Sequence, residues 1–90
     1  MAKSKQHTKI NWRDLVDYAS DKFFNNWLDC YVSAEDLTEA LQEGFENKNF
    51  GKWENSYDGK EYEYLECAYD IGVTARSYKS IVDLDAYYNS

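Results

Sequence analysis

Apolar side chains recur every three or four positions over residues 11–28, which is the spacing of one helix face. These apolar positions are Trp12, Leu15, Val16, Ala19, Phe23 and Trp27. Asn11 precedes them as a plausible N-cap, and the helix dipole favours Asp14 in the first turn. The segment is therefore predicted to be a helix. Phe24 and Leu28 fall on its far side, so its second half is predicted to lie in the core or, alternatively, to form a contact surface.

A second helix is predicted at residues 34–43. Ser33 followed by Asp36 resembles a capping box, and Gly44 followed by Phe45 fits a left-handed helix end. The polar face carries four acids and no Lys or Arg: Glu35, Asp36, Glu39 and Glu43. Because like charges four residues apart destabilise a helix by about 0.2–0.5 kcal/mol per pair, this acid row costs stability that mixed charges would not.

After residues 46–49 the apolar period changes to two, which indicates strands. Asp58 and Gly59 are typical of a two-residue hairpin turn. That turn sets Glu54 opposite Glu63, and like charges directly opposed destabilise a hairpin unless something outside relieves them. The hairpin is therefore predicted to carry a second acid row.

The C-terminal part is predicted to add further strands. Gly72 is predicted to end one strand, residues 73–78 to form the next and residues 82–88 the last, although Ser80 followed by Asp83 fits the cap of a short helix instead. The predicted fold class is therefore α+β, with two N-terminal helices followed by a three- or four-stranded antiparallel sheet.

Residues 1–10 have no apolar periodicity and are predicted to form a mobile basic arm, whereas residues 11–90 are predicted to form one acidic domain. Three Trp, nine Tyr and four Phe supply core material that a disordered acidic tail lacks. No apolar run approaches the roughly 20 residues that cross a bilayer. We therefore expect a soluble cytoplasmic protein with no membrane contact.

Charge is unevenly distributed along the chain, whose net charge is −7. Residues 1–13 hold four bases and no acid and so carry +4, while residues 14–90 hold six bases and all seventeen acids and so carry −11. A body this acidic repels nucleic-acid phosphates, so direct binding to nucleic acid is not expected.

Catalytic and metal chemistry find little support in the sequence. The single histidine, His7, lies in the arm without a scaffold to orient it. Cys30 and Cys67 are predicted to be buried and unreactive, because the adjacent Asp29 and Glu66 raise a thiol pKa, although one disulfide is compatible with the sequence. No phosphate-binding glycine loop or calcium loop occurs. We therefore predict no enzyme, no cofactor and no metal.

The acid rows and the aromatic residues predict a protein-binding surface. Carboxylates stand about 6 Å apart on successive helical turns and about 6.6 Å apart on one strand face, close to every second phosphate along a DNA strand. Tyr and Trp are favoured interface anchors. The predicted partner-binding residues are Glu35, Asp36, Glu39, Glu43, Glu46, Trp53, Glu54, Tyr57, Asp58, Glu61, Tyr62, Glu63, Tyr64, Glu66 and Asp70.

In size, acidity, aromatic content and lack of catalytic residues, the chain resembles the small acidic inhibitors of bacteriophages and mobile elements, such as antirestriction and anti-CRISPR proteins. Some of these are DNA mimics. The resemblance covers no alignable stretch and carries over no functional residue. The predicted partner is a larger basic nucleic-acid-binding protein, a nuclease or a CRISPR or restriction component, whose site the acids block. The host cytoplasm is the expected compartment if the protein is phage-encoded.

The alternative is a structural or regulatory interaction module, antitoxin-like or self-associating. It would be held by apolar surface around Phe24, Leu28, Tyr87 and Tyr88. The arrangement of the two acid rows bears on the choice. Rows on one side of the molecule favour mimicry, whereas divergent rows indicate that the charge serves solubility.

Overall fold

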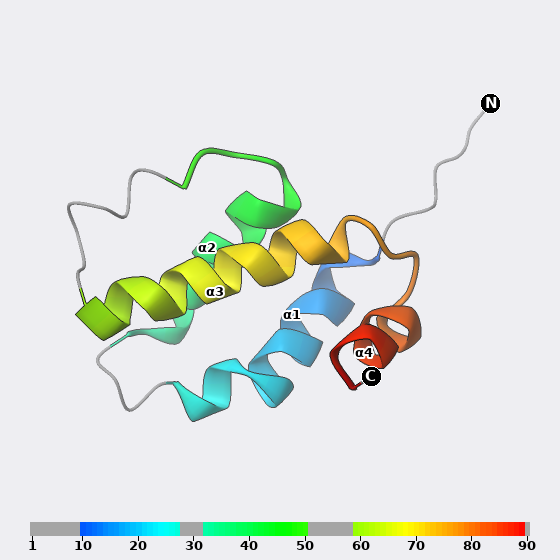
Figure 1. The fold of residues 1–90 in the computed structure, drawn as a ribbon, viewed down its shortest axis with the longest axis horizontal. Coiled ribbons are helices and arrows are strands. Elements are labelled where there is room, and N and C mark those ends of the chain that lie inside the picture. Colours follow the sequence, from blue (N-terminus) through cyan, green and yellow to red (C-terminus); the bar gives the residue numbers. More distant parts are fainter. Residues whose placement is uncertain (1–9, 28–31, 51–58, 90) are drawn as a thin grey trace.

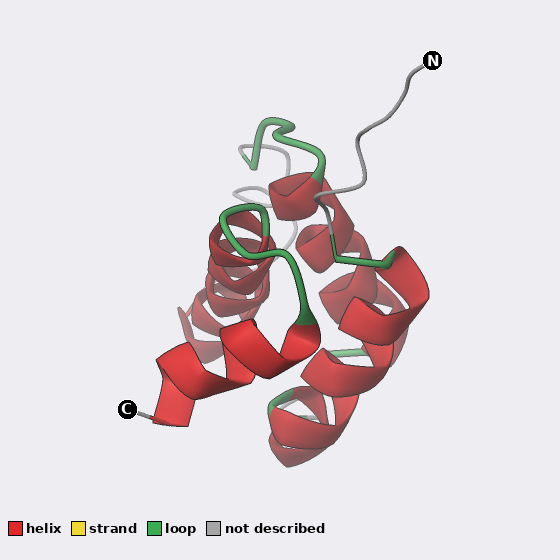
Figure 2. Cartoon of the chain, turned by 90° about the vertical axis from the view of Figure 1, so that its right-hand side faces the viewer, coloured by secondary structure: helices red, strands yellow, loops and turns green. Residues whose placement is uncertain are grey.

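The computed structural model describes residues 10–27, 32–50 and 59–89, and the regular elements within these ranges are all helices (Figures 1 and 2). They are α1 (Trp12–Lys22), the 3-10 turn η2 (Phe24–Asn26), α2 (Ala34–Phe45), α3 (Gly59–Ala75) and α4 (Ile81–Asn89). The predicted α+β fold is therefore wrong, because the described ranges contain no strand.

Helix α1 begins where its cap predicts. The Asn11 side chain accepts hydrogen bonds from the backbone N–H groups of Arg13 at 2.9 Å and Asp14 at 3.2 Å. The η2 turn then carries Phe24 into the core, where it is 1% exposed, so the core interpretation of Phe24 is confirmed. Leu28 lies outside the described residues.

Helix α2 also begins at its predicted cap, since the Ser33 hydroxyl accepts from the Asp36 N–H at 3.0 Å. The predicted stop at Gly44 is wrong. The helix runs through Gly44 to Phe45, and the residue with left-handed backbone is Asn47, at φ 62°. Gly44 therefore has a role other than ending the helix.

That role is close packing, because two glycines let α2 and α3 cross with their backbones in contact. A Cβ on Gly44 would lie 2.0 Å from the carbonyl oxygen of Tyr69, and one on Gly72 would lie 2.2 Å from the carbonyl oxygen of Leu41. Figure 1 shows α3 crossing α2. Gly72, predicted to end a strand, is thus a packing residue inside a helix.

Helix α3 occupies the segment that was predicted to form the second strand of the hairpin. Its buried residues recur at three- and four-residue spacing: Leu65, Ala68, Ile71, Gly72 and Ala75. The sequence also fits the two-residue period of a strand, because Tyr62 and Tyr64 lie on other sides of the helix. These two side chains are half-buried against Phe50 and Trp27. With apolar side chains around much of the helix, spacing alone does not separate a helix from a strand.

The predicted strands at 73–78 and 82–88 are also wrong. Helix α3 continues to Ala75, and α4 takes the place of the last strand. The helical alternative for this segment is confirmed, since the Ser80 hydroxyl accepts from the Asp83 N–H at 3.2 Å.

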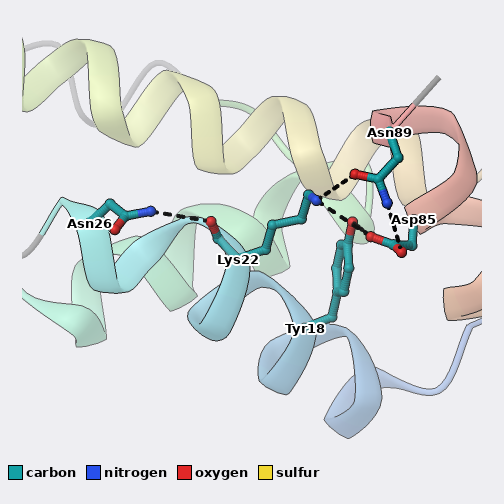
Figure 3. A network of polar contacts seen from close by, with 5 residues as sticks. All are labelled: Tyr18, Lys22, Asn26, Asp85 and Asn89. Carbon is teal, nitrogen blue, oxygen red and sulfur yellow. Dashed lines mark hydrogen bonds and ion pairs between the residues drawn. The ribbon is translucent and has the colours of Figure 1, made fainter.

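A polar network fastens α4 to α1 (Figure 3). The Tyr18 hydroxyl donates to the Asp85 carboxylate at 2.9 Å, and Lys22 Nζ lies 3.5 Å from the same carboxylate. Lys22 also donates to the Asn89 side-chain oxygen at 2.9 Å, and the Asn89 amide donates to Asp85 at 3.0 Å. Burial and the hydrogen bond to Asp85 raise the pKa of Tyr18, so its hydroxyl remains a donor. The network holds α4 at one position beside α1.

One core joins these helices, and it begins at Ile10, which is 3% exposed although it was assigned to the arm. The other residues of the arm, 1–9, lie outside the described ranges. No helix in the described part of the chain is long and apolar enough to cross a membrane.

Candidate functional site

An open groove of about 460 Å³ lies between the end of α1, α3 and α4. Its walls are mainly apolar and aromatic. The lining residues are Phe23, Trp27, Ile71, Val73, Tyr87 and Tyr88, together with Cys67, Asp70 and Thr74. We call this hollow the aromatic groove.

Ring contacts join the walls of the aromatic groove to one another. Phe23 and Tyr88 meet edge to face with ring centroids 5.1 Å apart, and Tyr87 and Tyr88 do so at 5.0 Å. Such pairs add about 0.5–1.5 kcal/mol beyond the area they bury, so they favour one arrangement of the rings. Tyr87 is still 51% exposed and Val73 37% exposed. The aromatic groove thus offers apolar surface to an occupant.

Three carboxylates continue from the aromatic groove along the outer face of α3. Glu63, Glu66 and Asp70 are exposed, and their spacing of three and four residues corresponds to rises of about 4.5 and 6 Å along the helix. None of the Lys or Arg residues in the described ranges forms an ion pair with these acids. Asp70 also lines the aromatic groove. We call these residues the α3 acid row.

The exposed acids of α2 form a separate row. Glu35, Glu39 and Glu46 are exposed, whereas Leu41 and Gly44 of the same helix face α3. At 3.6 residues per turn, the three acids lie on the far side of α2 from α3. The two acid rows therefore diverge, which counts against mimicry by both rows together, and the α2 row is most simply a solvated face that serves solubility.

The remaining predicted acids of α2 are only partly available. Glu43 is 8% exposed and Asp36 is half-buried. Glu46 lies 3.3 Å from Lys48 Nζ and accepts a hydrogen bond from Gln42 at 3.0 Å. The repulsion among the acids of this helix is therefore partly offset by a cation, Lys48, that lies just beyond the helix end.

The predicted aromatic anchors have structural contacts instead. Tyr62 packs on Phe50 with ring centroids 5.4 Å apart, and Tyr64 stacks on Trp27 at 5.2 Å. Glu61 is half-buried in the first turn of α3. The other predicted partner-binding residues lie outside the described ranges: Trp53, Glu54, Tyr57 and Asp58.

Cys67 lies beside the α3 acid row and lines the aromatic groove. The residue is exposed, so the predicted burial is wrong, while Cys30 lies outside the described residues. Partial burial of the thiol raises the pKa of Cys67, and the charges of Asp70, Glu66 and Glu63 raise it further. The predicted direction of this pKa shift is confirmed.

Cys67 can therefore report on the charge of the α3 acid row. Replacing that row with neutral isosteres (Glu63→Gln, Glu66→Gln and Asp70→Asn, the α3 triple variant) is expected to lower the pKa of Cys67. At pH 7.5 more thiolate then forms, and iodoacetamide alkylates Cys67 faster. Peptide mass spectrometry follows the rate at this residue.

The matched control removes three exposed acids from α1 (Asp14→Asn, Asp17→Asn and Asp21→Asn, the α1 triple variant). It changes the net charge by the same amount, and the alkylation rate of Cys67 is expected to stay at the wild-type value. Equal acceleration in both variants would show that Cys67 responds to net charge rather than to its neighbours.

Neither a metal-ligand cluster among the described residues nor a matching protein assigns a role to these groups. Within the ranges that the structure describes, no three His, Cys, Asp or Glu residues gather as metal ligands. Comparison with protein families, curated proteins and solved structures found no match. The α3 acid row and the aromatic groove remain the features from which a function can be inferred.

The acids of this surface were predicted from the sequence, whereas its apolar half was not. Val73 was assigned to a strand, and Tyr87 was considered only for self-association. The helical spacing of Asp70, Val73 and Thr74 is the signal that places these residues together, and it applies only once α3 is read as a helix.

Proposed function

We propose that the protein is a small non-enzymatic inhibitor that binds a larger, basic nucleic-acid-binding protein and blocks its nucleic-acid site. The outer face of α3 is the docking surface. The observation that carries this proposal is that the α3 acid row runs into the aromatic groove, with Asp70 belonging to both. Carboxylates steer association with a basic surface, and a desolvated aromatic pocket supplies an anchor.

The spacing of the α3 acid row supports the replacement of phosphates. Rises of about 4.5 and 6 Å lie between one and two phosphate intervals of a DNA strand, which carries a charge every 3.4 Å or so. A basic channel built for a phosphate backbone therefore offers Lys and Arg at distances that these carboxylates can match. The divergent α2 row is not needed for this contact.

Capture from a bacterial lysate on the immobilised protein tests the proposal. Nucleic-acid-binding proteins are expected to be retained at low salt, to be released as salt rises and to be displaced by excess duplex DNA. Capture that is unchanged from low to high salt and unaffected by duplex DNA would contradict the proposal.

A self-associating module remains the second candidate, favoured by the apolar surface around the aromatic groove. Tyr87 is 51% exposed and Val73 is 37% exposed, whereas Phe24 is buried and cannot contribute. Light scattering separates the two candidates. A dimer that persists in high salt and dissociates on Tyr87→Ser supports self-association, and a monomer at all salt concentrations argues against it.

A further inference from the structure

We propose that the aromatic groove binds an amphipathic helix of the partner. This helix places an apolar side chain in the aromatic groove and sets Lys or Arg side chains over the α3 acid row. The inference rests on the proposed function and names the part of the partner that is bound.

The apolar half of this proposal follows from the lining of the aromatic groove. Its volume of about 460 Å³ lies toward the lower end of the range for small-molecule pockets, about 300–1,000 Å³, but the hollow is open rather than enclosed. Val73 and Tyr87 expose apolar surface at its rim. An open, apolar hollow between the end of α1, α3 and α4 suits side chains projecting from a docked segment, as in helix-in-groove recognition.

The charged half follows from the position of Asp70. Among the described residues this carboxylate is the one acid that lines the aromatic groove, and Glu66 and Glu63 extend from it toward the N-terminus of α3. From Asp70 to Glu63 the rise is about 10.5 Å, or two helical turns. A partner helix with Lys or Arg on successive turns can therefore pair with all three acids while its apolar side faces the aromatic groove.

An occupant of a different composition fits less well. A wholly apolar segment leaves three carboxylates without cations beside it, and a segment of Lys and Arg alone leaves Tyr87 and Val73 uncovered. The combination of apolar and basic residues satisfies both parts of the surface. It also agrees with a partner whose surface binds phosphates, because such surfaces are rich in Lys and Arg.

A random peptide library displayed on phage tests the inference without knowledge of the partner. Selection on the wild-type protein is expected to enrich peptides with an aromatic or large aliphatic residue and with Lys or Arg at three- or four-residue spacing. One enriched peptide is then synthesised and its affinity measured. Its binding is also expected to protect Cys67 from iodoacetamide, because that thiol lines the aromatic groove.

Variants localise the peptide. Val73→Ser combined with Tyr87→Ser is expected to weaken binding at least tenfold, and the α3 triple variant to weaken it and reduce its salt dependence. Val82→Ser is the matched control, because Val82 is 77% exposed on α4 and does not line the aromatic groove. Val82→Ser and the α1 triple variant are expected to bind as the wild type does. Circular dichroism verifies that each variant is folded.

Selection that enriches no peptide, or peptides lacking either residue class, overturns the inference, as does equal binding to the Val73→Ser, Tyr87→Ser variant. A different result would contradict the proposed function. If lysate capture is sensitive to salt and duplex DNA but the groove variant retains it, the helix inference is wrong and the inhibitor proposal stands. If capture is insensitive to both, the inhibitor proposal itself is wrong.

Discussion

Gly72→Ala is expected to destabilise the protein by roughly 3 kcal/mol or more, at the upper end of the usual cost of overpacking. The new Cβ would lie 2.2 Å from the carbonyl oxygen of Leu41 and 2.6 Å from the backbone nitrogen of Phe45. Both are backbone atoms, so no side-chain rotation relieves the clash and the helices must move apart. In Gly44→Ala the new Cβ would lie 2.0 Å from the carbonyl oxygen of Tyr69, and the expected loss of stability is similar.

The sign of this effect makes the prediction specific. In an exposed helix interior, replacing Gly with Ala stabilises by about 0.8–1 kcal/mol, so destabilisation here isolates the packing of α2 on α3. Gly59→Ala is the control. A Cβ at Gly59 would have no other atom within 4 Å. Placing a residue with a side chain at this φ of +60° costs only about 1–2 kcal/mol of stability.

Urea unfolding followed by circular dichroism measures all three variants. We expect Gly72→Ala and Gly44→Ala to lower the midpoint further than Gly59→Ala. A domain of this size is stable by about 5–13 kcal/mol, so the double variant Gly44→Ala, Gly72→Ala is expected to lose a large part of that stability and to unfold at a lower urea midpoint than either single variant. A Gly72→Ala protein as stable as the wild type would contradict the close crossing of the helices.

The second large effect concerns partner binding. The α3 triple variant is expected to weaken the affinity for a captured partner about 10- to 100-fold, since three charge pairs worth about 0.5–1 kcal/mol each are lost. The slope of affinity against salt concentration is expected to fall as well. Biolayer interferometry across a salt series measures both quantities.

The α1 triple variant separates local recognition from net charge. Asp14, Asp17 and Asp21 are exposed like the members of the α3 acid row, and their removal changes the net charge equally. Affinity is expected to stay within about threefold of the wild type, because none of the three lines the aromatic groove or belongs to the α3 acid row, and salt screens their remaining effect. Equal losses in the two triple variants would show that the partner responds to overall charge.

The first two helices were predictable because their signals are local. Asn11 and Ser33 cap the helices that their positions indicate, and the apolar stripes behind them have one clear face. The end of α2 was missed because Gly44 has its role in tertiary packing. A glycine that ends a helix and a glycine that admits another backbone look alike in one sequence.

Helices α3 and α4 were misread because local preference opposed the outcome. Tyr and Val favour strands, and apolar side chains lie around much of α3, so period two matched its sequence as well as a helical period did. For α3, close packing against α2 through Gly72 favours the helix. This contact joins segments that are distant in the sequence.

The candidate site was predictable in its acids and not in its shape. Glu63, Glu66 and Asp70 were predicted to contact a partner, although strand faces were expected to carry them. The aromatic groove depends on α4 lying beside α1 and α3, and Tyr18 and Asp85, which help to hold it there, are 67 residues apart. The spacing of residues along the chain does not predict a contact between residues this far apart.

Competition on the isolated partner shows whether the protein occupies the partner's nucleic-acid site. A fluorescent duplex bound to the partner is titrated with the wild-type protein, and fluorescence anisotropy and native mass spectrometry follow the complexes. We expect the wild-type protein to displace the duplex completely without forming a ternary complex. The α1 triple variant is expected to displace it equally, and the α3 triple variant to displace it weakly or not at all. A partner that holds duplex and protein together would contradict this expectation.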